Sequence, residues 1–275
     1  MKPAAFDYLK AESLMEAADA LAEAGEDGRV LAGGQSLMPM LNMRLARPSL
    51  LVDIMGIHGL ARIEVVKDRV RIGAGVRQAA LLNWDGLGDH LPLVKAALPW
   101  VGHAQTRSRG TVCGSVAHAD PSAELPLVLC ALAGDIVLRT RSRVRTVQAV
   151  DFFIGMMATE LRAGEMVECV SLPKRSSGTG CAFREIGRRH GDFAIVACAA
   201  VVDAHGARLA VGGVADVPVV RDLPLPGSGD LDDALNEFAW SLQARDDLHA
   251  SARYRRELVR RLGRETIEEA ARCRV

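Results

Sequence analysis

The segment RVLAGGQSLMP, residues 29–39, decides how this chain is interpreted. A short apolar strand leads into the paired glycines Gly33 and Gly34, and a helix start follows them. Glycine lets the backbone turn tightly and approach a ligand, and the free N–H groups and dipole at a helix start attract an anion. The segment therefore predicts a phosphate-binding loop at the end of a strand.

A second glycine-punctuated segment, RSRGTVCGSVAHADP at residues 107–121, has the composition to form the other half of such a site. Two phosphate-binding segments suggest a diphosphate as ligand. A lone Gly-Gly-x-Ser would favour an ordinary strand-to-helix turn. The ligand interpretation therefore depends on the second segment and on a resemblance that covers nearly the whole chain.

Together the two segments resemble the FAD-binding medium subunit of molybdenum hydroxylases, the group of carbon monoxide dehydrogenase, xanthine dehydrogenase and bacterial hydroxylases of N-heterocycles. The family pattern reads AGGxS, then a helix with leucine and proline, and later RNRGTIGGSxAHADPxAE. This chain reproduces it with Ser108 for Asn, Val112 for Ile and Cys113 for Gly. The resemblance continues through residues 151–153, 184–185, 191–194 and 250–256.

This resemblance implies an α+β protein with two parts. Residues 1–174 would form a two-lobed FAD-binding domain of the vanillyl-alcohol-oxidase (PCMH) type, with lobes at about 1–55 and 56–174. Residues 178–275 would form a C-terminal α+β domain with a small antiparallel sheet, like that of CO-dehydrogenase flavoproteins. The polar stretch PKRSSGTG, residues 173–180, marks the expected boundary.

Local patterns predict the elements within these parts. A capping box at Ser13–Glu16 opens a helix that ends at Gly25, and a βαβ unit follows, with the glycine loop at the carboxyl end of its first strand. Asp120 suits the N-cap of a helix over 122–133. The other expected helices are 37–45, 78–82, 93–101 and the region from 232 onward. The expected strands are 29–32, 50–54, 63–66, 70–74, 136–140, 144–147, 166–172, 181–186, 194–202 and 208–214.

The resemblance also implies which residues bind FAD. Backbone N–H groups of residues 32–36 and the Ser36 hydroxyl would bind the pyrophosphate, Glu124 would lie near the ribose, and Arg184 would place a cation near the flavin and stabilise its reduced form. The expected set is Ala32, Gly33, Gly34, Gln35, Ser36, Leu37, Val101, Thr111, Gly114, Ser115, His118, Asp120, Glu124, Val167, Arg184, Asp192 and Phe193. No catalytic residue and no metal ligand is expected on the chain itself.

Some of these residues also fit simpler roles. An arginine in a strand, such as Arg184, is usually solvated or ion-paired at the surface, and Phe193 also suits a core position. The arginine-rich last helix, with glutamates interspersed, is typical of a solvated face or a subunit contact.

Composition limits the class of partner. The 275 residues carry 34 Lys+Arg and 34 Asp+Glu, so no overall charge favours nucleic acid. The six cysteines are scattered, so iron–sulfur clusters would lie on a partner. The start of the chain lacks a signal peptide's apolar core, and no run of about eighteen apolar residues occurs, so we expect a cytoplasmic protein without membrane insertion.

The function implied is electron transfer in a molybdenum hydroxylase. A large subunit would hold the molybdenum–pterin cofactor and a small subunit two iron–sulfur clusters, in a dimer of heterotrimers acting on an N-heterocycle or another small aromatic or carbonyl compound. One alternative is a self-sufficient FAD oxidase or dehydrogenase, although two tyrosines and few clustered polar groups argue against it. The other is a non-catalytic nucleotide-binding assembly subunit, supported by Cys113, because a side chain at a φ > 0 position costs about a kcal/mol.

Overall fold

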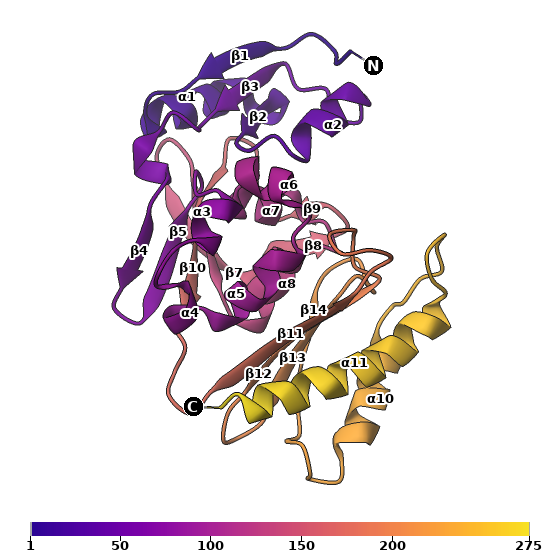
Figure 1. Cartoon of the computed structure of the whole chain (residues 1–275). Coiled ribbons are helices and arrows are strands. Elements are labelled where there is room, and N and C mark those ends of the chain that lie inside the picture. Colours follow the sequence, from indigo (N-terminus) through magenta and orange to yellow (C-terminus); the bar gives the residue numbers. More distant parts are fainter. Residues whose placement is uncertain (1, 275) are drawn as a thin grey trace.

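The chain begins with a small parallel sheet of order β1-β3-β2, at the top of Figure 1. The structure is a computed structural model that describes residues 2–274. Its first strands are β1 (Asp7–Lys10), β2 (Gly28–Leu31) and β3 (Leu50–Asp53), with helices α1 (Leu14–Ala24) and α2 (Leu37–Asn42). Ser13 Oγ accepts the N–H of Glu16 at 3.1 Å and thereby caps α1, as the capping-box pattern predicts. This arrangement puts the loop 32–36 at the carboxyl end of β2.

An antiparallel sheet of order β4-β5-β10-β6-β7 forms the middle of the molecule. Short helices between β5 and β6 carry the second glycine segment, and α7 packs on β5 and β10. The sheet strands are β4 (Ile63–Val66), β5 (Arg69–Gly73), β6 (Asp135–Arg139), β7 (Val144–Gln148) and β10 (Met166–Pro173). The other elements are α3 (Gln78–Leu82), α4 (Leu87–His90), α5 (Pro92–Ala97), α6 (Ala104–Arg109), α7 (Val112–His118), α8 (Glu124–Ala131), α9 (Ala149–Phe152), β8 (Phe153–Gly155) and β9 (Ala158–Thr159).

The last part is an antiparallel meander of order β11-β12-β13-β14. Its strands are β11 (Gly180–Ile186), β12 (Val196–Val202), β13 (Ala207–Gly212) and β14 (Val219–Leu223). Helix α11 (Ala252–Arg272), with α10 (Leu231–Ser241) against it, covers one face, and α5 and α8 contact the other (Figure 1). All eight residues of α8 are buried. One face of the helix packs against the meander, and the neighbouring helices α5, α7 and α9 cover the other faces. An apolar surface all round a helix is typical of such a position.

Most of the elements expected from the sequence are present, with shifted ends. Helix α2 ends at Asn42 rather than at residue 45, and the expected helix over 122–133 is shorter, with α8 beginning at Glu124 after the N-cap Ala123. Asp120 is therefore not the N-cap of this helix, and its Oδ1 accepts the N–H of Ser122 at 2.8 Å in the preceding turn. Pro126 explains the late start, because proline is tolerated in the first turn and interrupts the hydrogen bonds further inside.

Several elements were not expected at all: β1, β14, the β8–β9 ribbon, the short helices α4 and α9, and the helices α6 and α7 on either side of Gly110. Within residues 2–274, no helix combines the length and apolar character needed to cross a membrane.

Candidate functional site

One large cavity, of about 1410 Å³, is lined by residues from all three sheet regions. Its volume exceeds the roughly 300–1,000 Å³ of pockets for drug-sized ligands, so a dinucleotide can fit. The walls contain the two glycine segments and the loops that follow β11 and β13. Every residue of the expected FAD-binding set lines this cavity except Arg184.

The first glycine loop packs directly against the backbone of the second segment. A Cβ atom on Gly33 would lie 2.2 Å from the carbonyl oxygen of Arg109, and Gly34 has φ of +70°, so both positions require glycine. Within residues 2–274, the N–H groups of Gly34, Gln35 and Ser36 have no acceptor, and Ser36 makes no side-chain cap. These donors are therefore free for an anion in the cavity.

In the second glycine segment, local contacts within and beside α7 explain why threonine, cysteine and glycine occupy positions 111, 113 and 114. Thr111 Oγ1 accepts the N–H of Gly114 at 3.0 Å and caps α7, and a Cβ on Gly114 would lie 2.6 Å from that oxygen. Cys113 lies in the first turn of α7, is 2% exposed, and is not among the residues with positive φ. Its thiol donates to the carbonyl oxygen of Ile72 at 3.5 Å. The departure from the family pattern therefore causes no backbone strain, and the assembly-subunit alternative loses its support.

Two carboxyl groups with raised pKa values lie near the second segment. Burial raises the pKa of Glu124, which is 6% exposed and lines the cavity, to about 7. Burial, and then the charge of Glu124, raise the pKa of Glu185 on β11 to about 8. A protonated carboxyl group can donate as well as accept a hydrogen bond, so this region can bind a hydroxyl group either as its donor or as its acceptor.

His118 and Asp120 also line the cavity. Burial lowers the pKa of His118 despite the opposing charge of Asp120. The imidazole is therefore neutral at neutral pH and can accept or donate a hydrogen bond toward a ligand. Among residues 2–274, no group of three or more His, Cys, Asp or Glu side chains is arranged to hold a metal ion.

The loop after β11 supplies the end of the cavity nearest the meander. Phe193 is 72% exposed there rather than part of the core, and Asp192 Oδ2 is buried and makes no hydrogen bond among residues 2–274. Arg188 Nε forms an ion pair with this same oxygen at 3.7 Å, and the ring centroids of Trp100 and His190 lie 4.8 Å apart. An exposed aromatic ring and a carboxylate oxygen without a hydrogen bond on a cavity wall are features of a ligand contact.

Arg184 lies elsewhere. Its guanidinium pairs with Glu265 at 3.2 Å and Glu269 at 2.9 Å, both on α11. Successive side chains of a strand point to opposite faces, so Arg184 faces α11 while Glu185 faces the region of Glu124. The structure thus gives no support to the expected place of Arg184 beside a flavin.

The structure also reveals a cavity residue that the sequence interpretation missed. Arg255 on α11 is 5% exposed, lines the cavity, donates to the carbonyl oxygen of Ile195 at 2.8 Å and to that of Gly213, and pairs with Asp247. Arg260, Arg261 and Arg264 are exposed, as expected for arginines on a solvated face of the last helix. Arg255 instead shares a helix face with buried Leu258, Val259 and Leu262, and this spacing was the available signal.

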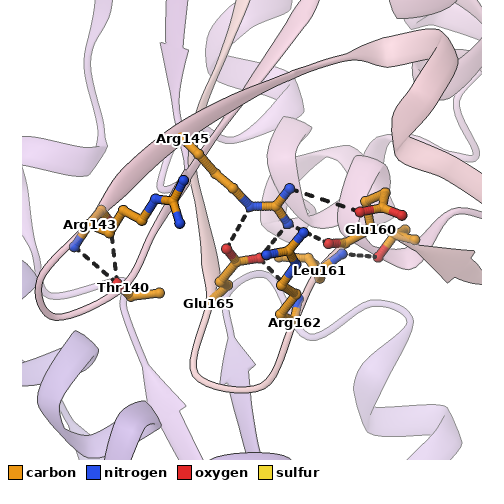
Figure 2. A network of polar contacts seen from close by, with 8 residues as sticks. Thr140, Arg143, Arg145, Glu160, Leu161, Arg162 and Glu165 are labelled. Atoms are coloured by element: carbon orange, nitrogen blue, oxygen red, sulfur yellow. Dashed lines mark hydrogen bonds and ion pairs between the residues drawn. The ribbon is translucent and has the colours of Figure 1, made fainter.

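An ion-pair network fixes another wall of the cavity, the loop from Thr159 to Val167. Figure 2 shows Arg145, on β7, beside the Glu165 carboxylate, to which its Nε and Nη2 donate at 2.7 Å. Arg145 also donates to the Glu160 carbonyl oxygen at 2.6 Å, and Glu165 accepts the N–H of Arg162 at 3.0 Å. Burial opposes ionisation of Glu165, but these donors outweigh it, and the pKa of this carboxyl group is lowered.

The residues present fit FAD. Free backbone N–H groups and tightly packed glycines suit a diphosphate, Asp192 offers a buried carboxylate oxygen that makes no hydrogen bond, and Arg188, Arg245 and Arg255 place cations on the wall.

Comparisons with known proteins agree with this geometry. Residues 4–175 match the family model described as "FAD binding domain in molybdopterin dehydrogenase". The nicotine 6-hydroxylase medium subunit of Paenarthrobacter nicotinovorans is 39% identical over 98% of this chain and 99% of its own. Subunit alpha of the 6-hydroxypseudooxynicotine dehydrogenase complex from the same organism is 37% identical, over 98% and 96%. A chain of reconstituted CO dehydrogenase from Oligotropha carboxidovorans superposes with a TM-score of 0.95 at 29% identity, covering 99% of this chain and 100% of that one.

Proposed function

Because the chain belongs to the family of FAD-binding domains of molybdopterin dehydrogenases, we propose that it is the FAD-carrying electron-transfer subunit of a heterotrimeric molybdenum hydroxylase. The chain is an oxidoreductase component, as its relatives are named. It takes electrons from iron–sulfur clusters on a small partner subunit and passes them to an external acceptor. The molybdenum–pterin cofactor belongs to a large partner subunit.

The observation that carries this proposal is the cavity with two phosphate-binding segments in backbone contact. The N–H groups of Gly34, Gln35 and Ser36 hold the pyrophosphate from one side, and Thr111, Gly114 and Ser115 line the other. Glu124 and His118 bind hydroxyl groups next to it, and Asp192 and Phe193 orient the ring system at the far end. Bound FAD supplies the reversible uptake and release of electrons, while the protein supplies position and electrostatics.

The exposed apolar surface beside the cavity favours a protein partner. The β8–β9 ribbon exposes Ile154 by 60%, Met156 by 53% and Met157 by 46%, and the two methionines line the cavity. Apolar side chains clustered on a surface often mark a protein interface. This surface lies close enough to the cavity for a partner bound there to deliver electrons.

The substrate proposed is an N-heterocycle or another small aromatic or carbonyl compound, bound on the large subunit. Two relatives are named for nicotine and for 6-hydroxypseudooxynicotine, which supports the first class. We also propose a cytoplasmic complex arranged as a dimer of heterotrimers, and two domains, residues 1–174 and 178–275.

The test is the visible spectrum of the chain co-expressed with the products of neighbouring genes, with the released cofactor identified by chromatography. The proposal expects stoichiometric FAD and iron–sulfur absorbance from co-purifying subunits, both bleached by a pyridine compound such as nicotine. FAD on the lone chain that reacts directly with such a compound would instead establish a self-sufficient oxidase. A protein that takes up no flavin would refute both.

A further inference from the structure

The two phosphate-binding segments meet a third stretch of chain at Gln78. Gln78 is the first residue of α3 and is 4% exposed, although its side chain is polar. Arg77 and Thr111 form an isolated antiparallel bridge, in which the Gln78 N–H donates to the Gly110 carbonyl at 2.8 Å and the Val112 N–H donates to the Val76 carbonyl at 3.1 Å. The second segment is thus attached to α3 through its backbone.

The side chain of Gln78 adds a contact of its own. Its Nε2 donates to the carbonyl oxygen of Thr111 at 3.4 Å. A Cβ on Gly110 would lie 3.0 Å from Gln78 Oε1, so the amide occupies the space that a side chain at position 110 would need. Gly33 in turn packs against the backbone of Arg109 and Gly110. Gln78, Gly110 and Gly33 therefore lie in consecutive contact.

The Gln78 amide oxygen makes no hydrogen bond within residues 2–274 and is buried. A buried acceptor without a partner destabilises the folded chain, so selection for stability alone would favour an apolar residue of the same shape. Gln78 also lines the cavity that we assign to FAD. A buried polar group that lowers folding stability and lies beside a ligand site indicates a role in ligand binding.

We infer that Gln78 is a positioning residue for the FAD pyrophosphate, acting through the second phosphate-binding segment, and this rests on the proposed function. Its backbone and side-chain amides bind the carbonyl oxygens of Gly110 and Thr111. A peptide carbonyl free to turn toward a diphosphate would repel it, whereas these two are fixed. The neighbouring free donors then keep the orientation that an anion requires.

The experiment measures FAD affinity and the melting temperature of the FAD-free full-length chain for wild type, Gln78→Met and Gln78→Glu. Methionine keeps the length of glutamine and removes both amide atoms. Asn83→Met is the matched control, because Asn83 lies at the other end of α3, is exposed, and donates to the Ala79 carbonyl at 2.9 Å. FAD is removed and added back, and binding is followed by flavin fluorescence.

Gln78→Met is expected to weaken FAD binding by about five- to tenfold, the effect of one hydrogen bond, without lowering the melting temperature of the FAD-free chain. Gln78→Glu is expected to bind more weakly still at pH 8, because its carboxylate repels the Thr111 carbonyl and the diphosphate. Relative to wild type at the same pH, this loss should shrink at pH 5.5, where a protonated carboxyl can donate again. Asn83→Met should change neither quantity.

An affinity of Gln78→Met within twofold of wild type would overturn the inference. So would a fall in melting temperature that parallels the loss of affinity, since that is a purely structural role. Both results leave the proposed function intact. Failure of the wild-type chain itself to bind FAD would overturn the proposed function, and this inference with it.

Discussion

Gly33 shows how one missing side chain can define a binding site. A Cβ there would lie 2.2 Å from the Arg109 carbonyl oxygen and 2.7 Å from Gly110 Cα, both of which are backbone atoms that cannot move aside. Any side chain would therefore separate the two glycine segments. The glycine pattern was visible in the sequence, but this contact partner, more than seventy positions away, was not.

The first prediction follows from that contact. Gly33→Ala should weaken FAD binding by about five- to 150-fold, because overpacking of this kind costs about 1–3 kcal/mol. Gly59→Ala is the control, since a Cβ on Gly59 meets nothing within 4 Å. FAD titration measures the affinity of both variants. If Gly33→Ala and Gly59→Ala bind FAD equally well, the close packing at Gly33 is contradicted.

Glu185 is a residue whose charge is disfavoured in the folded chain. It is 8% exposed, its Oε2 has no partner among residues 2–274, and its pKa is raised to about 8 by burial and by Glu124. The folded state thus holds a proton that the unfolded state releases near pH 4.3. Below about pH 4.3 the carboxyl group is protonated in both states, and the folded chain has its full stability. As the pH rises from about 4.3 toward 8, the unfolded state gains from ionising this group and the free energy of unfolding falls.

Glu185→Gln should therefore raise the free energy of unfolding, relative to wild type, by about 3–4 kcal/mol more at pH 8 than at pH 5, because each unit of pKa shift corresponds to about 1.4 kcal/mol. Urea denaturation at both values measures the difference in the free energy of unfolding. Glu64→Gln, at an exposed position on β4, serves as control. If Glu185→Gln and wild type differ equally at the two pH values, Glu185 is not protonated in the folded chain.

At the scale of elements, the loop 159–167 depends on a single arginine. The side chains of Arg145 and Glu165 are 16% and 7% exposed, and they meet through two 2.7 Å hydrogen bonds (Figure 2). Removing one partner of a buried pair leaves an uncompensated charge, which is far more costly than losing an exposed pair. The loop lines the cavity, so its order affects the ligand as well.

Arg145→Met should destabilise the chain by about 3 kcal/mol, and adding Glu165→Gln should recover part of the loss. The control is Arg141→Met, because Arg141 pairs with Asp19 at 3.0 Å with 63% of its side chain exposed. That change should cost less than about 1 kcal/mol. Urea denaturation compares the three variants, and a similar loss for Arg141→Met would show that burial of the pair is not decisive.

Elements with strong local signals were predictable, and others were not. Helix α1 has its cap, its apolar spacing and its terminal glycine between Ser13 and Gly25. Strand β1, with sequence DYLK, has no apolar alternation, and it exists because it pairs with β3 more than forty residues later. Pairing at such a distance leaves no trace in the local sequence.

At the scale of the whole molecule, the meander and the rest of the chain share one core. Phe183, Ala197, Ala199 and Ala210 belong to the same buried cluster as the residues of α8, and the Gly213 N–H donates to the Pro121 carbonyl at 2.8 Å. The proposed boundary near residues 174–178 therefore separates two sheets that need one another for burial. Exposing such a surface in water is strongly unfavourable.

A chain ended after residue 178 should consequently aggregate or lack a cooperative thermal transition, because the face of α8 that packs against the meander would be exposed to water. Size-exclusion chromatography and thermal denaturation beside the full-length chain test this. A monomeric fragment with a cooperative transition would show instead that the first 178 residues fold on their own.

The sequence by itself determined the glycine loops, helix α1 with its cap, most of the strands and the family. These depend on backbone geometry and spacing among near neighbours, which a linear pattern records. Nearly all the residues that the resemblance assigned to FAD line the cavity, but that assignment also included Arg184, which does not.

Only the tertiary structure decided which face of β11 turns toward the cavity, so that Glu185 lies near Glu124 while Arg184 pairs with α11. Only the tertiary structure buried Arg255 beside the cavity and brought Gln78 behind Gly110. Neighbouring side chains of a strand always point to opposite faces of the sheet. Which face turns toward the cavity, and which distant segments come into contact, depends on the surfaces that the folded chain buries together.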